Sequence, residues 1–116
     1  MEKYLFKTQT SMKDYNRDKW WISYDYVGQI EIEAISLKDA LEKYAQIVEE
    51  KHCIGISKNA LKTKRPMFID TKDGRTIQTG YVITGSSIFH DDEARKWTTQ
   101  YIDLWVEILK FEYAAA

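Results

Sequence analysis

Histidine, cysteine and carboxylate side chains gather at two places in the sequence, and their types could bind a metal ion or carry out hydrolysis. His52 and Cys53 are adjacent, and His90 is followed by three acidic residues at 91–93. A structural zinc site takes four Cys or His ligands, whereas the whole chain has one Cys and two His. We therefore expect no metal ion, no cofactor and no catalytic residue.

Cys53 is a weak candidate for a nucleophile, because a nucleophile needs a base and an orienting partner close in space. Neighbouring side chains on a strand point to opposite faces, so His52 could not activate Cys53 there. We expect a buried structural cysteine. The Gly-Ser-Ser run at 85–87 lacks the flanking glycines of a nucleophile elbow. The prediction is a chain without enzymatic activity, with an unrecognised hydrolase-type activity as the alternative.

Four cations occur in a short stretch without acids, at Lys58, Lys62, Lys64 and Arg65. Such a stretch could follow a phosphate backbone, and exposed tryptophans could stack on bases, as in proteins that bind single-stranded nucleic acid. The chain has 17 basic and 18 acidic residues and a net charge of −1, whereas duplex binders are usually strongly basic. Single-stranded nucleic-acid binding through this loop is therefore the alternative function.

Aromatic residues in the last strand-like segment favour a protein-binding surface. Ile102, Leu104, Val106 and Ile108 alternate with residues of mixed character, which is typical of a strand with one aliphatic face. The other face carries aromatic residues beside Asp103 and Glu107, and interface cores favour Trp and Tyr. The predicted protein-binding residues are Trp21, Tyr101, Trp105 and Phe111. Self-association in a homodimer is the alternative to an external partner.

Hydrophobic periodicity and turn residues predict the elements that must position these side chains. Ser36 and Asp39 are typical of a helix start, and the apolar stripe that follows predicts a helix over about 37–51. A polar connection is expected at 12–19, a basic loop at 57–65 and a turn at Asp73-Gly74. The expected strands are 4–10, 20–26, 30–35, 67–69, 76–89 and 97–113. Residues 97–113 also carry apolar residues at helical spacing, so a helix there is the alternative.

The sequence thus predicts an α+β fold, in which an antiparallel sheet of five to six strands carries one main helix on one face. Residues 1–113 are expected to form a single domain, with 114–116 a vector-derived tail. One cysteine, no export signal and no apolar membrane span favour the cytoplasm. We expect a small interaction domain, such as a bacterial, phage or mobile-element accessory protein that acts as an inhibitor or adaptor.

Overall fold

Five strands form one antiparallel sheet in the order β2-β1-β5-β4-β3. The computed structural model describes residues 1–14, 19–93 and 95–111, and for residues 12–14, 19–26, 89, 91 and 111 it describes the backbone alone. The expected α+β fold with an antiparallel sheet and one main helix is confirmed. The elements are β1 (Glu2–Asp14), β2 (Lys19–Ala34), α1 (Leu37–His52), α2 (Lys58–Lys62), β3 (Arg65–Asp70), β4 (Thr76–Asp91) and β5 (Lys96–Phe111).

The helix α1 begins and ends as the sequence predicts. The Ser36 hydroxyl accepts a hydrogen bond of 3.2 Å from the Asp39 backbone N–H, and the Asp39 carboxylate accepts one of 3.1 Å from the Ile35 N–H. These bonds satisfy backbone donors that have no partner within the helix. At the other end, Cys53 adopts a left-handed conformation at the C-cap, so the chain leaves the helix sharply.

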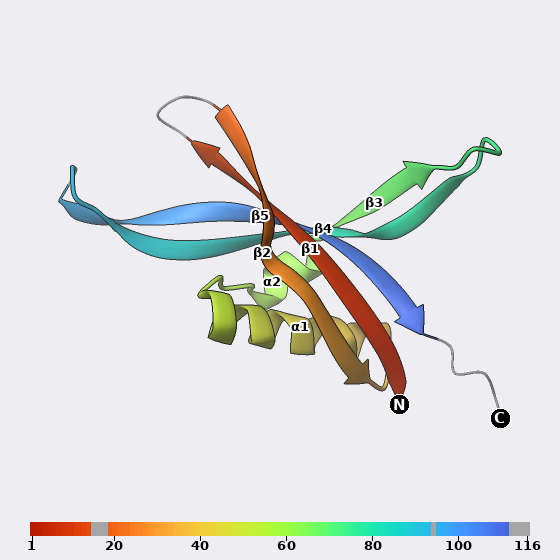
Figure 1. Ribbon diagram of the computed structural model, residues 1–116. Coiled ribbons are helices and arrows are strands. Elements are labelled where there is room, and N and C mark those ends of the chain that lie inside the picture. The colour runs from red at the N-terminus through yellow and green to blue at the C-terminus, as the bar shows by residue number, and fades with distance from the viewer. Residues whose placement is uncertain (15–18, 94, 112–116) are drawn as a thin grey trace.

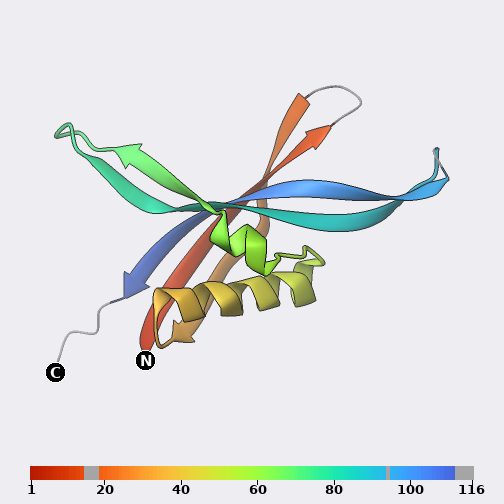
Figure 2. The same ribbon diagram turned by 180° about the vertical axis from the view of Figure 1, so that it is seen from behind.

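The core lies between α1 and one face of the sheet (Figures 1 and 2). Phe6 is fully buried, and its ring stacks on that of Tyr44 with centroids 4.9 Å apart. The hydroxyls of Tyr44 and Thr8 share a hydrogen bond of 2.6 Å. Leu104 and Val106 of β5 are also fully buried. The aliphatic face predicted for the last strand is therefore confirmed as core.

The structure corrects four of the local predictions. Of the polar connection expected at 12–19, residues 12–14 belong to β1 and residue 19 to β2, because the two strands pair as far as Asp14 and Lys19. The expected strands 20–26 and 30–35 are one strand, β2, whose pairing with β1 shifts between Thr8 and Thr10, and Gly28 adopts a positive φ of 72° at this irregularity. The expected basic loop at 57–65 contains the short helix α2, capped by the Ser57 side chain. Cys53 is exposed instead of buried, because it forms the C-cap of α1 at the edge of the core. The strand predicted at 97–113 is confirmed over 97–111 and the helix alternative is wrong there, while residues 112 and 113 and the tail predicted at 114–116 lie outside the described residues.

Two-stranded arms project from the centre of the sheet (Figure 1). β4 pairs with β3 only from Thr76 to Val82, and β5 pairs with β1 only from Ile102 to Phe111. The β4–β5 arm (residues 87–101) and the β3–β4 arm (residues 67–79) therefore extend in opposite directions along β4. The molecule measures 60 × 34 × 24 Å, with a radius of gyration of 16.1 Å, against about 13 Å for a compact domain of this length.

Replacement of Phe6 by Ala should lower the free energy of unfolding by about 3–5 kcal/mol, because it leaves a cavity beneath Tyr44. Urea denaturation followed by circular dichroism measures the change. Leu5→Ala is the matched control, since Leu5 is next in the strand, points to the opposite face and is only partly buried. Equal losses from the two variants would contradict the assignment of the core face.

Burial raises the pKa of Tyr44 above its usual value near 10. The unfolded chain therefore loses this proton first, so the stabilising effect is complete below about pH 10 and declines as the pH rises further. The double variant Thr8→Val, Tyr44→Phe should stay within about 1 kcal/mol of wild type at pH 7, because both hydrogen-bonding groups are removed together. Above about pH 10 its stability should fall less steeply, by up to about 1.4 kcal/mol per pH unit. Urea titrations at pH 7, 10 and 11 test this, and parallel declines would refute it.

Candidate functional site

The sheet face opposite α1 carries exposed aromatic side chains and is the candidate site. We call it the open face and define it by the residues that share one face in the register: 97, 99, 101, 103, 105, 107 and 109 of β5, with 82, 84, 86, 88 and 90 of β4. Side chains alternate along a strand, so these residues point away from the buried Ile102, Leu104 and Val106. Tyr101 is 53% exposed and Trp105 is 41% exposed. Two of the four predicted protein-binding residues thus lie on one face.

Hydrogen bonds hold the centre of the open face in place. The Trp105 indole N–H donates to the Ser11 hydroxyl at 2.8 Å. The Thr84 hydroxyl donates to the Asp103 carboxylate at 2.8 Å, and the Arg65 guanidinium lies 3.6 Å from the same carboxylate. These contacts connect β1, β3, β4 and β5. The hydrogen bond to Ser11 restrains the Trp105 ring, although the side chain is partly exposed.

The β4–β5 arm extends the open face beyond the helix-covered core. Trp97 is 71% exposed and Ile88 is 68% exposed. The His90 ring lies edge-on to the Trp97 ring, with centroids 5.4 Å apart, and His90 Nδ1 lies 2.9 Å from an Asp92 oxygen. Trp97 and Ile88 were not among the predicted protein-binding residues. Trp97 lies four positions before Tyr101, so the period-two pattern of β5 could have placed it on the same face, whereas Ile88 joins that face only through the pairing of β4 with β5.

Trp21 and Phe111 do not join Tyr101 and Trp105 in any contact that the structure describes. The backbone of Trp21 pairs with Met12 in the β1–β2 ladder, and that of Phe111 pairs with Lys3. Their side chains lie outside the described part of the structure. Their predicted role in protein binding therefore stays a prediction.

Internal contacts engage two of the four predicted nucleic-acid-binding cations. Lys64 donates to the Leu61 carbonyl at 3.0 Å and lies over the Tyr81 ring, 5.0 Å from its centroid, while Arg65 faces Asp103. Lys58 and Lys62 are exposed on α2. In the sheet register Arg65 and Trp105 lie on either side of Val82, so one cation and one aromatic residue lie two strands apart, about 10 Å between backbones.

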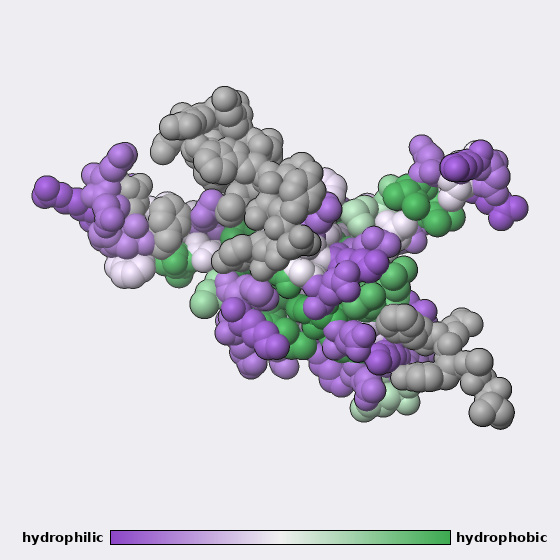
Figure 3. All heavy atoms as spheres, viewed as in Figure 1, coloured by the Kyte–Doolittle hydropathy of each residue, from purple (hydrophilic) through white to green (hydrophobic). Residues whose placement is uncertain are grey.

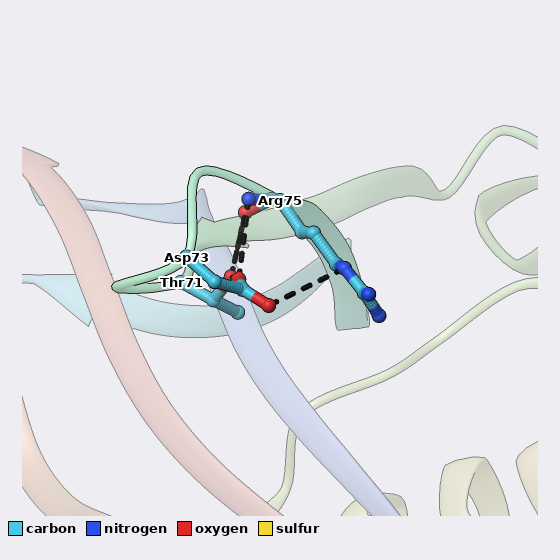
Figure 4. Close-up of polar contacts among 3 residues, drawn as sticks. All are labelled: Thr71, Asp73 and Arg75. Atoms are coloured by element: carbon cyan, nitrogen blue, oxygen red, sulfur yellow. Dashed lines mark hydrogen bonds and ion pairs between the residues drawn. The ribbon is translucent and has the colours of Figure 1, made fainter.

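The turn that closes the β3–β4 arm is built from its own side chains (Figure 4). Hydrogen bonds from the Thr71 hydroxyl and the Arg75 backbone N–H hold the pKa of Asp73 below its usual value. The Arg75 Nε lies 3.3 Å from the same carboxylate, and Gly74 adopts a positive φ of 83°. The Asp73-Gly74 turn is thus confirmed, and its polar groups serve the turn itself.

A shallow depression of about 450 Å³ lies where the segment after α1 meets β4. Gly55 and Ser86 exchange two backbone hydrogen bonds there, of 2.7 and 2.9 Å, and Tyr101 and Glu49 lie at its rim. A Cβ on Gly85 would lie 2.6 Å from the Ile54 side chain, so glycine permits this close approach. The depression is open to solvent, and no histidine or cysteine is among the residues that line it.

Within the described ranges, no three His, Cys, Asp or Glu side chains lie close enough to hold a metal ion together. Neither of the two helices in that part of the chain has the length and apolar character needed to cross a membrane. Comparison of the chain with protein-family models, with curated proteins and with solved structures gives no significant match.

A double-mutant cycle on Arg65 and Asp103 tests the polar contacts of the open face. Arg65→Met, Asp103→Asn and the double variant should give a coupling energy of about 0.2–1 kcal/mol in urea denaturation, because Arg65 is largely exposed. The coupling should weaken in 1 M NaCl, where exposed charges are screened. A coupling of zero at low salt would show that the two charges do not interact.

Proposed function

We propose that the chain is a small non-enzymatic interaction domain that contacts another protein chain through the open face. The observation that carries this proposal is the exposure of Trp97, Tyr101 and Trp105 on one face. Trp and Tyr are enriched among the residues that contribute most to protein binding. An inhibitor or adaptor of a larger protein, as encoded by bacteria, phages or mobile elements, is the role that we propose for it.

The arrangement of charge supports the same proposal. Interfaces combine an apolar centre with a polar rim. Hydrophilic residues lie at the tips of both arms, and hydrophobic residues lie at the stem of the β3–β4 arm (Figure 3). Phe68, Ile69 and Ile77 of that arm are each about half exposed. A partner that covers the stems would thus meet apolar surface bordered by charges.

Single-stranded nucleic-acid binding is the second candidate, and the presence of Arg65 and Trp105 on either side of Val82 favours it. A stacking aromatic residue next to a cation is the arrangement used for bases and phosphates. Against it, Lys64 and Arg65 already contact groups of the chain. Binding of a fluorescent oligonucleotide that falls steeply with salt would favour this candidate.

Affinity capture with tagged chain from a lysate of its native cell tests the proposed function. Wild type should retain at least one protein, which can be another copy of the chain. The variant Trp97→Ser, Tyr101→Ser should retain at least tenfold less of that protein. Removal of two exposed aromatic anchors is expected to weaken binding by more than one decade.

Ile35→Ser is the control, because Ile35 is 74% exposed but lies between β2 and α1, away from the open face. It removes apolar surface without touching the proposed interface, so capture should be unchanged. Equal loss from both variants would indicate non-specific adhesion. Full retention by Trp97→Ser, Tyr101→Ser would refute the open face as the interface.

A further inference from the structure

The β4–β5 arm has apolar side chains that its own chain leaves uncovered. Beyond the pairing of Gly55 with Ser86 and of Ile102 with Met12, no third strand pairs with residues 87–101 in the described part of the structure. A two-stranded ribbon is marginally stable by itself in water. Ile88, Trp97 and Tyr101 of this ribbon are exposed, so their apolar side chains contribute little hydrophobic stabilisation to the single chain. Coverage by another chain would stabilise the arm.

The accessible surface of the chain is larger than that of a compact monomer of the same mass. The accessible surface is 8550 Å², whereas a compact monomer of 13.7 kDa exposes about 6,600 Å². The excess is roughly 2,000 Å² per chain. A standard interface removes about 800 Å² from each partner, and permanent dimers remove more. This excess counts the whole chain, and it is larger than the area that one standard contact removes from each partner.

The charge pattern of the arm permits contact with an identical surface. In a two-fold contact, a residue on the axis meets the same residue of the second copy. A charge near the axis is therefore repelled by the same charge of the second copy. On the open face of the arm, Ile88, Trp97, Thr99 and Tyr101 carry no charge. His90, opposite Trp97, is the ionisable residue of this face, and its Nδ1 lies 2.9 Å from Asp92 at the tip of the arm. The net charge of the chain is only −1, so two copies approach with little long-range repulsion.

We propose that the chain forms a homodimer in which the open faces of two β4–β5 arms pack about a two-fold axis near Thr99. Thr99 pairs with Ile88 in the ribbon, and Trp97 and Tyr101 are two positions away on either side. An axis there places Trp97 of one copy opposite Tyr101 of the other, with the two Ile88 side chains close to the centre. This inference rests on the proposed function and names its partner as a second copy.

Charge pairs at position 99 test this geometry directly. Wild type should sediment at about twice the 13.7 kDa of one chain at micromolar concentration. Thr99→Lys and Thr99→Glu should each weaken the dimer at least tenfold, because like charges meet at the axis. A 1:1 mixture of the two variants should recover the dimer, since Lys then faces Glu. Sedimentation equilibrium across a hundredfold range of concentration measures all three.

Ile35→Lys is the control for an added exposed charge, and it should remain dimeric. Circular dichroism must show that each variant keeps the wild-type spectrum, and Thr99→Ser provides a milder variant that should remain dimeric. A wild type that stays monomeric throughout, single-charge variants that stay dimeric, or a mixture that stays monomeric would each overturn the inference. In any of these cases the proposed function still holds if capture of another protein depends on Trp97 and Tyr101, and it fails if capture does not.

Discussion

The packing of Tyr44 against β1 is the interaction on which the rest of the structure depends. Its ring stacks on Phe6, and its hydroxyl shares a hydrogen bond with Thr8. Apolar packing and a directional hydrogen bond thus hold the same side chain of α1 against β1. This places the helix over β1 and β2. Because side chains alternate along strands, the choice of buried face in β1 also fixes the buried faces of β5 and β4 through the register. The opposite face of the same strands is then the open face.

The lengths of β4 and β5 supply the second constraint. Each has 16 residues, which is long for a strand in a small domain, and neither neighbour accompanies them over their full length. Beyond the ends of β1 and β3 the sheet has only two strands, and the single helix α1 does not reach along both arms. Apolar residues on the arms therefore stay in contact with solvent in the single chain. The exposed Trp97 and the exposed Ile88 are two consequences of the same geometry.

The centre of the open face differs in character from the arm. At the centre, Trp105 and Asp103 are held by Ser11, Thr84 and Arg65, so this part is pre-arranged and polar at its edge. On the arm, Trp97 and Tyr101 are more exposed than Trp105, and the next charged residue on the same face of β5 is Asp103, which Arg65 and Thr84 already contact. A rigid centre with an apolar extension can orient a partner at one place and gain hydrophobic burial at another.

The sequence by itself determined the local elements. Ser36 and Asp39 predicted the start of α1, Asp73-Gly74 predicted a turn, and the alternation at Ile102–Ile108 predicted a buried strand face, because caps, turns and period-two patterns depend on neighbouring residues. Only the tertiary structure decided that residues 19–34 are one strand, that Cys53 is exposed, that Arg65 faces Asp103 and that Trp97 is uncovered. These features depend on strand order and register between residues far apart in the chain. A pairing shift of one residue would exchange the two faces of a strand without changing its sequence pattern.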